Sequence, residues 1–275
     1  MAALHHGRKR LDEGFPLSNR LVREIHAELQ PTGRGDSMMP GQFRRSRNWI
    51  GGGGPDSAAF APPPHTAVPG CMSALERFLH AGDDGIPALL RAGLAHVQFE
   101  TIHPFLDGNG RVGRALIELI LCDAGVLHHP VLCRSLYFRQ ARSVYYRLLN
   151  SVRITGDWET WLIFFLSGVE QTAEAGVSTA LRLLRLFKED AGKIKSVAGR
   201  RAGSATRLLR ALRVTPITSL PLARERTGLS YRGTSSAMQV LVEHGIAREI
   251  TNRHRNRLFA YQACLDILNE ETEMR

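Results

Sequence analysis

Apolar residues return at helical spacing along most of this chain. In residues 17–29 a leucine or isoleucine occupies every fourth position, with charged residues and His26 between them, so a helix with His26 on its polar side is predicted there. Similar patterns predict helices over residues 71–78, 86–99, 115–121, 136–152, 158–175 and 177–197. The chain is therefore expected to be mainly α-helical.

Residues 31–70 interrupt this pattern. They contain a run of four glycines at 51–54 and three prolines at 62–64, and both runs break regular structure. The short apolar segments at 48–50 and 58–61 flank the glycines and could pair as a β-hairpin.

The pattern changes again from about residue 199. Helices are predicted over residues 205–213, 222–226 and 231–244, and two strands over 247–251 and 257–261 flank a basic tip. This order resembles a winged helix-turn-helix, whose second helix would expose Tyr231, Arg232 and Gln239. Such a domain can bind DNA or another protein, and the sequence leaves both open.

Composition narrows the class of protein. The net charge is +10 and the calculated pI is about 10.1, which favours anionic ligands. The four cysteines form no Cys-x-x-Cys pair and are expected to be reduced thiols in a cytoplasmic protein. No apolar run reaches the roughly 18 residues of a membrane span, and no secretory signal follows Met1, so no membrane contact is expected.

Candidate functional side chains are concentrated in residues 103–114, which read His-Pro-Phe-Leu-Asp-Gly-Asn-Gly-Arg-Val-Gly-Arg. An apolar helical stretch follows, so the segment is predicted to be a loop that leads into a helix N-terminus, which attracts phosphate. Gly108 and Gly110 allow close approach of the backbone to a ligand. Arg111 and Arg114 are three residues apart and would share one helix face, as a clamp on phosphoryl oxygens requires.

Two further side chains in this run suit a reaction on a phosphate. His103 would accept a proton near neutral pH if its imidazole is uncharged. Asp107 offers hard oxygen ligands for Mg²⁺ held together with phosphates.

This run resembles the signature of the Fic family, H-x-F-x-[DE]-G-N-G-R-x-x-R, at every specified position. Family members mostly transfer AMP from ATP to a Ser, Thr or Tyr hydroxyl of a protein. The resemblance implies that His103 is the general base and that Asp107 holds Mg²⁺. It further implies a phosphate cradle made by Gly108, Asn109, Gly110, Arg111 and Arg114.

The resemblance also implies an architecture. Residues 1–198 would form a Fic-type helical domain, with a β-hairpin flap at about 41–70 that holds the target segment by strand addition. Residues 199–275 would form the winged-helix domain. An aromatic pair followed by Gly-Asp-Trp is comparable with a family element near the adenine pocket, and Tyr146 is carried over to that role.

Alternatives remain at this point. A related phosphotransferase would phosphorylate instead, although such relatives replace the glycine at Gly110 by a bulkier basic residue. A DNA-binding regulator could use the Fic module as a sensor. The family's inhibitory element, [ST]-x-x-x-E-[GN], is missing from this sequence, so the chain is truncated, unrestrained or restrained by a partner. Self-modification is expected, and a homo-oligomer is left open.

Overall fold

The computed structural model describes residues 2–29, 39–52, 54–82, 84–127, 137–138, 140–251, 253 and 256–273. The chain divides into two compact units, Met1–Thr172 and Ala173–Arg275. The division lies within one long helix, α8 (Trp158–Val197), and precedes the boundary predicted at residue 198. No helix in the described part of the chain combines the length and the apolar character needed to cross a bilayer.

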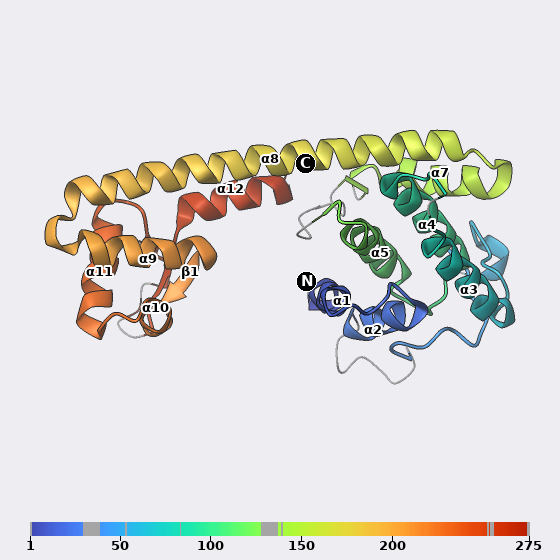
Figure 1. Ribbon diagram of the computed structural model, residues 1–275, viewed down its shortest axis with the longest axis horizontal. Helices are drawn as coiled ribbons and strands as arrows, with labels where there is room; N and C mark the ends of the chain where they lie inside the picture. The colour runs from blue at the N-terminus through green and yellow to red at the C-terminus, as the bar shows by residue number, and fades with distance from the viewer. Residues whose placement is uncertain are drawn as a thin grey trace. The chain divides into compact units, whose positions relative to one another are not determined.

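The first unit is a helical assembly (Figure 1). Among the described residues before α8, the helices are α1 (Ala2–Asp12), α2 (Asn19–Leu29), α3 (Val68–Leu79), α4 (Ala88–Ile102), α5 (Asn109–Asp123) and α7 (Arg142–Thr155). Short 3₁₀ turns η2 (Pro55–Ser57) and η3 (His65–Ala67) interrupt the segment between α2 and α3. The expectation of a mainly helical chain is confirmed.

Helices α4 and α5 form the centre of this unit. On α4, Gly93 lets α8 approach closely, because a Cβ atom there would lie only 3.0 Å from the Phe165 ring. The Trp161 side chain is fully buried against the same place and its Nε1–H donates to the Gly93 carbonyl at 3.0 Å. Phe99 of α4 and Leu116 of α5 complete the core. This packing fixes the two helix ends that meet at residues 103–108.

Three helix predictions need correction. Residues 158–197 form one helix, where two helices were predicted over residues 158–175 and 177–197. Helix α1 and helix α12 (Gln262–Glu273) were not predicted. The start predicted for α7, at residue 136, lies outside the described residues, and the helix itself begins at Arg142.

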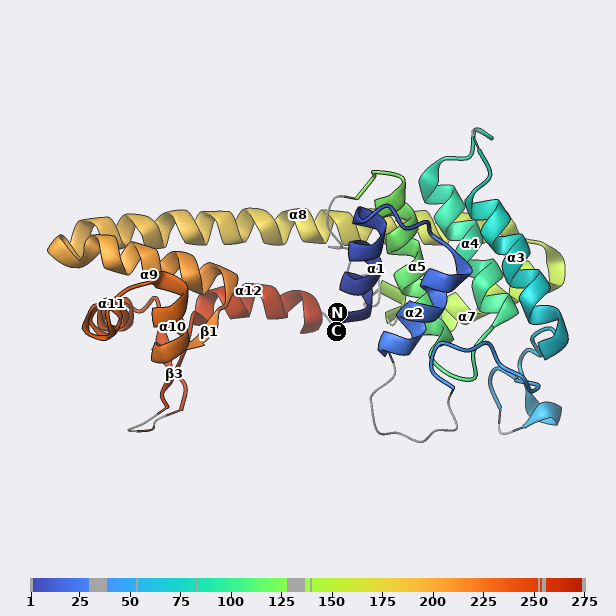
Figure 2. The same cartoon turned by 60° about the horizontal axis from the view of Figure 1, so that its bottom comes forward.

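The second unit follows the predicted order closely (Figure 2). After α8 and the turn η4 (Gly199–Arg201) come α9 (Ala202–Val214), β1 (Ile217–Ser219), α10 (Leu220–Thr227), α11 (Tyr231–Glu243), β2 (Arg248–Glu249), β3 (Leu258–Ala260) and α12. The strands form one antiparallel sheet in the order β1-β3-β2. Of the basic tip, Asn252, His254 and Arg255 lie outside the described residues.

Helix caps and a buried core define the second unit. The Ser230 hydroxyl accepts from Gly233 N at 3.1 Å and caps α11 after the turn that follows α10. Inside, the Tyr261 hydroxyl donates to the buried Asp190 carboxylate at 2.7 Å. Assignment of this unit as a winged helix stays a prediction.

Candidate functional site

The segment 103–108 joins the C-terminus of α4 to the N-terminus of α5. His103 ends α4 in the left-handed conformation, with φ 49° and ψ 61°, and its N–H donates to the Phe99 carbonyl at 2.9 Å. Pro104 follows and cannot continue the helix. Gly108 has φ 80° and precedes α5, whose first backbone N–H groups have no partner within the helix. The predicted order of loop and helix N-terminus is present, but the helix begins at Asn109, six residues before the predicted stretch 115–121.

Phe105 anchors this loop in the core. Its side chain is fully buried and stacks on the His26 ring, with centroids 3.8 Å apart and planes at 1°. The Asn109 amide closes the loop from the other side, since its Oδ1 accepts from Phe105 N at 2.9 Å and its Nδ2 donates to Phe105 O at 2.8 Å. The predicted cradle residue Asn109 therefore shapes the loop with its side chain.

His26 is buried, contrary to the polar-side position predicted for it. Its Nδ1 accepts the Gly41 N–H at 2.9 Å, so Nε2 carries the hydrogen and donates to the Asp107 carbonyl at 3.0 Å. Burial lowers the pKa of His26, so the ring is neutral at pH 7. The sequence pattern missed this contact because its partners come from outside α2.

The His103 imidazole is held in its uncharged form. Burial lowers its pKa to about 4, the positive charges of Arg153 and Arg44 contribute, and the backbone of Glu100 and the Asp107 carboxylate oppose the shift. A neutral imidazole at pH 7 can accept a proton, which is the state that a general base requires.

Asp107 and Arg111 lie on the exposed side of the loop. Their side chains form an ion pair at 3.3 Å, with 54% and 41% of the side-chain surface exposed. Arg111 also donates to the Leu29 carbonyl at 3.0 Å. An exposed pair of this kind is worth about 0–1 kcal/mol, so both groups are available to a ligand at little cost.

Arg114 lies beside the first turn of α5, near a buried carboxyl group. A Cβ atom on Gly110 would lie 3.2 Å from Arg114 Nη1, and one on Gly113 would lie 2.6 Å from Glu100 Oε1. Glu100 is 6% exposed, and burial raises its pKa to about 7 against the opposing charges of Arg114 and Arg153. Sequence reasoning missed Glu100, although an acidic residue in an apolar stretch before the motif was a usable signal.

Tyr146, which the resemblance assigns to the adenine pocket, lies on the exposed side of α7. It is 43% exposed, and its ring contacts Tyr145 and the Arg142 guanidinium, both on α7. Tyr145 is the member of the pair that is connected to the motif. Its hydroxyl lies 2.8 Å from His96 Nε2, and His96 Nδ1 lies 3.1 Å from the Gly113 carbonyl. The role assigned to Tyr146 stays a prediction.

The predicted flap pairs at one point. Ile50 and Phe60 form an isolated antiparallel bridge, with N···O distances of 2.9 and 3.2 Å in the two directions. Between them the chain turns tightly at Gly52, with φ 74°, where a Cβ atom would lie 2.2 Å from the Ser57 carbonyl oxygen. Asn48 Nδ2 donates to the Phe105 carbonyl at 3.3 Å, so the segment contacts the loop of the motif.

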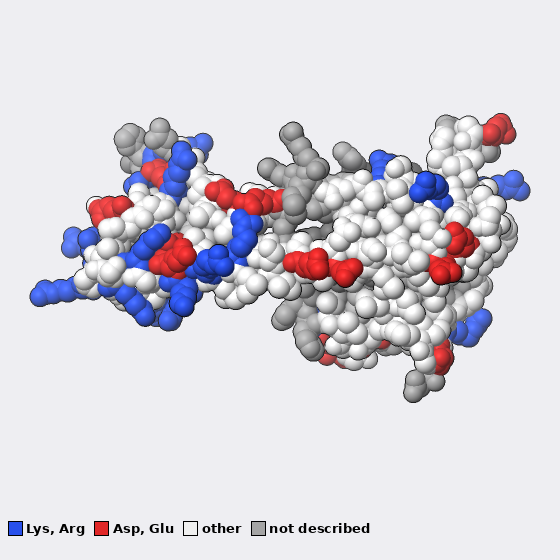
Figure 3. Space-filling model, turned by 90° about the horizontal axis from the view of Figure 1, so that it is seen from above, with Lys and Arg blue, Asp and Glu red and all other residues white. Residues whose placement is uncertain are grey.

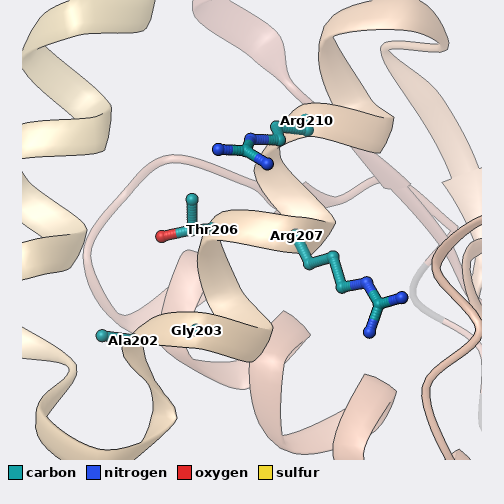
Figure 4. Close-up of a pocket in the computed structure, with 5 residues that line it drawn as sticks. All are labelled: Ala202, Gly203, Thr206, Arg207 and Arg210. Atoms are coloured by element: carbon teal, nitrogen blue, oxygen red, sulfur yellow. The ribbon is translucent and has the colours of Figure 1, made fainter.

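The second unit has a hollow of its own, of about 390 Å³, on α9. Figure 4 shows its lining, which includes Thr206 and the two arginines Arg207 and Arg210. None of the residues predicted for the site belongs to this unit. The motif residues are all brought together by α4 and α5 in the first unit.

Comparisons with known proteins agree with this geometry. Residues 16–121 match the family model of the Fic/DOC family. The chain is 30% identical over 154 residues to proteins called protein adenylyltransferase Fic from Drosophila ananassae and Drosophila melanogaster. These residues are 56% of this chain and 28% of each relative, so the chain spans under a third of the length of these relatives.

Solved structures resemble the fold. A Fic family protein from Desulfovibrio desulfuricans G20 has a TM-score of 0.53 at 20% identity, over 93% of this chain and 72% of that one. A Fic domain containing signaling protein from Bacteroides thetaiotaomicron VPI-5482 has a TM-score of 0.50 at 19% identity, over 66% and 68%. The complete motif between α4 and α5 lies within residues 16–121, the part of the chain that matches the family model, so this part of the chain is similar to the Fic/DOC family.

Proposed function

We propose that this chain transfers AMP from ATP to a hydroxyl group of a target protein, and to itself. The observation that carries the proposal is the loop 103–108, which joins the buried His103, whose pKa is lowered to about 4, to the N-terminus of α5. The name protein adenylyltransferase of the matched relatives supports the same reaction.

The proposed step is a displacement at the α-phosphorus. The target hydroxyl oxygen forms the new P–O bond, the bond to the β-phosphate oxygen breaks, and pyrophosphate leaves. His103 Nδ1 or Nε2 takes the hydroxyl proton. The N–H groups at the start of α5, with Gly108 and Gly110, hold the phosphates, and Arg111 and Arg114 bind the outer phosphoryl oxygens. Positioning and charge stabilisation supply most of the rate in such a transfer.

Asp107 fits the metal that this reaction uses. Mg²⁺ is usually held by one or two carboxylates together with substrate phosphates. Asp107 offers an exposed carboxylate next to the start of α5. When bound, Mg²⁺ would neutralise phosphate charge and ease the departure of pyrophosphate.

The test is incubation of the purified chain with a cell lysate and ATP labelled at the α-phosphate or, separately, at the γ-phosphate. Label from the α-phosphate and an AMP adduct in the mass spectrum are expected. Label from the γ-phosphate alone would favour the phosphotransferase reading. His103→Ala should lower transfer about 10²–10⁴-fold, as loss of a general base does. His5→Ala, at an exposed histidine of α1, is the matched control.

Arg114 provides a separate test of the nucleotide's orientation. Arg114→Ala should lower the affinity for ATP much more than the affinity for ADP, because only ATP has the third phosphate. A charge-assisted hydrogen bond is worth roughly 1.5–3 kcal/mol, which is about 10- to 100-fold in affinity. Calorimetry with both nucleotides measures the effect, and Arg20→Ala, at an exposed arginine, is the control. Equal losses of affinity for ATP and ADP would contradict the assignment of Arg114 to the third phosphate.

We propose DNA binding as a second function, for the second unit. Residues 173–275 contain 18 Lys and Arg against 10 Asp and Glu, a net charge of +8 out of the chain's +10. Figure 3 shows Lys and Arg side chains gathered over this unit on the face drawn. Tyr231, Arg232 and Gln239 are exposed on α11, the second helix of the helix-turn-helix pair. A winged helix would place that helix in the major groove.

Fluorescence anisotropy with a labelled duplex tests this second proposal. Affinity should fall steeply with salt, since phosphate contacts release counterions. Arg232→Ala should weaken binding more than Arg185→Ala, a change of equal charge at an exposed position on α8. Affinity that does not respond to salt would exclude the proposal. A cytoplasmic location suits both functions, because it supplies ATP and keeps the free thiols of Cys71, Cys122 and Cys264 reduced.

A further inference from the structure

Arg44 is a buried arginine of the flap segment, next to the loop of the motif. Only 2% of its surface is exposed, which is unusual for a charged residue. Its guanidinium donates to four backbone carbonyls: Nε to His103 at 2.9 Å, Nη1 to Ser46 at 3.0 Å, and Nη2 to Pro63 at 2.6 Å and Ile102 at 3.3 Å. Its own backbone N–H donates to the Pro104 carbonyl at 2.8 Å.

These acceptors belong to two groups that are far apart in the sequence. Ser46 and Pro63 belong to the flap segment and lie on the two sides of the bridge between Ile50 and Phe60. The other three carbonyls belong to His103 and its two neighbours. One side chain therefore closes the base of the flap and holds the backbone of the proposed general base.

The chemistry of these contacts is specific to arginine. The planar guanidinium has five N–H donors in a rigid fork, whereas a lysine ammonium presents its three donors from one atom. A lysine at this position could keep the charge but could not reach carbonyls on both sides. Removal of the guanidinium would leave several buried carbonyls without a hydrogen-bond donor. The lost free energy would destabilise the base of the flap and the loop of the motif together.

A second arginine connects the same two segments at another point. The Arg153 guanidinium lies over the Phe60 ring of the flap at 4.0 Å. Its Nη2 donates to the Glu100 carbonyl at 3.0 Å and its Nε to Thr101 Oγ1 at 3.1 Å, in the last turn of α4. The flap segment is thus attached to the turn that ends at His103 on both sides of the bridge between Ile50 and Phe60.

From these contacts we infer that Arg44 is a positioning residue, which couples the flap that receives the target segment to the backbone of His103. The inference rests on the proposed function. In this arrangement a displacement of the flap base moves the carbonyls at 102–104, and the left-handed backbone of His103 with them. The start of α5, where the nucleotide would bind, contacts Arg44 through none of the described hydrogen bonds. Target engagement and base alignment are therefore coupled, while nucleotide binding is independent of Arg44.

The test compares Arg44→Lys and Arg44→Met with Arg45→Met, which removes an exposed arginine at the next position. We measure ATP affinity by calorimetry, kcat and KM for transfer, hydrogen exchange at the amides of Ile50 and Phe60, and the titration of the His103 imidazole by NMR. A misplaced reacting group costs about 10²-fold in rate.

In both Arg44 variants, kcat should fall about 10²-fold, KM for the target should rise, and ATP affinity should stay within about twofold of wild type. Exchange at Ile50 and Phe60 should accelerate. The imidazole pKa should rise in Arg44→Met, which loses a nearby positive charge, and change little in Arg44→Lys. Arg45→Met should match the wild type in every measurement.

Unchanged flap exchange and unchanged kcat in a folded Arg44→Lys would overturn the inference. Equal losses of ATP affinity and kcat in Arg44→Lys would also overturn it, because Arg44 would then be a general scaffold residue. If Arg44→Met does not fold, Arg44→Lys alone decides. If the wild-type chain labels no protein, the proposed function is wrong. Hydrogen exchange and the imidazole titration still test the coupling between the flap and His103.

Discussion

A fall in pH from 7 to 5 should destabilise this protein through His103. An ordinary histidine has a pKa near 6.5, whereas burial lowers that of His103 to about 4. Between these two values the unfolded chain binds a proton at this residue and the folded chain does not. The stability contribution is therefore complete above pH 6.5 and is lost as pH falls toward 4.

The size of the effect follows from the two pKa values. At pH 5 the difference in proton binding amounts to about 2 kcal/mol of unfolding free energy. At the same pH about 90% of the folded molecules keep a neutral imidazole, compared with about 3% for an unperturbed histidine. Transfer activity that depends on the neutral base should therefore persist well below pH 6.5.

The assay is urea denaturation of the wild type and of His103→Asn at pH 7 and pH 5. Burial also shifts the pKa of other groups, down for His26 and up for Glu100, and these contribute to the pH dependence of both proteins, so the quantity of interest is the difference between them. Backbone strain at residue 103 does not depend on pH and cancels in this comparison. The wild type should lose about 2 kcal/mol more than the variant on going to pH 5. Equal losses in the two proteins, or an imidazole that titrates near 6.5 by NMR, would refute the reasoning.

Three further predictions concern other parts of the chain. Gly52→Ala should loosen the flap, because the new Cβ would lie 2.2 Å from the Ser57 carbonyl oxygen, and transfer to the target should fall while ATP affinity by calorimetry stays constant. Tyr261→Phe should lower the unfolding free energy by about 1.5–3 kcal/mol, since the buried Asp190 carboxylate loses a donor at 2.7 Å; denaturation in urea measures this, and no change would contradict it. Asp107→Ala should abolish Mg²⁺-dependent transfer and leave the melting temperature almost unchanged, because its exposed ion pair contributes about 0–1 kcal/mol.

The sequence predicted helices well where their buried faces are large and apolar. Helix α1 was missed because its buried residues are Ala3 and Gly7, which make close contact through their small size. A Cβ atom on Gly7 would lie 3.0 Å from a Leu119 methyl group. The two helices predicted over 158–175 and 177–197 are one helix, because a glycine inside a helix costs only about 1 kcal/mol and α8 continues through Gly176.

In the candidate site, features set by neighbouring residues were predicted, and features set by contacts with distant segments were not. A loop that leads into a helix N-terminus follows from local chemistry and was predicted, but the helix begins at Asn109, earlier than the predicted stretch 115–121. Arg44 and Glu100 were not, because their partners come from distant segments. Arg44 stands in a run of polar and basic residues that reads as solvated surface, and only the fold brings four carbonyls to it.

The left-handed backbone of His103 has a consequence for protein engineering. A residue with a side chain costs about 1–2 kcal/mol in this conformation, and glycine avoids that cost. Selection of a variant library for thermal stability alone should therefore enrich glycine at position 103. The selected variants would lack the proposed general base. Selection for folding and selection for chemistry favour different residues at this position, so stabilisation of this protein for practical use requires that position 103 be held fixed.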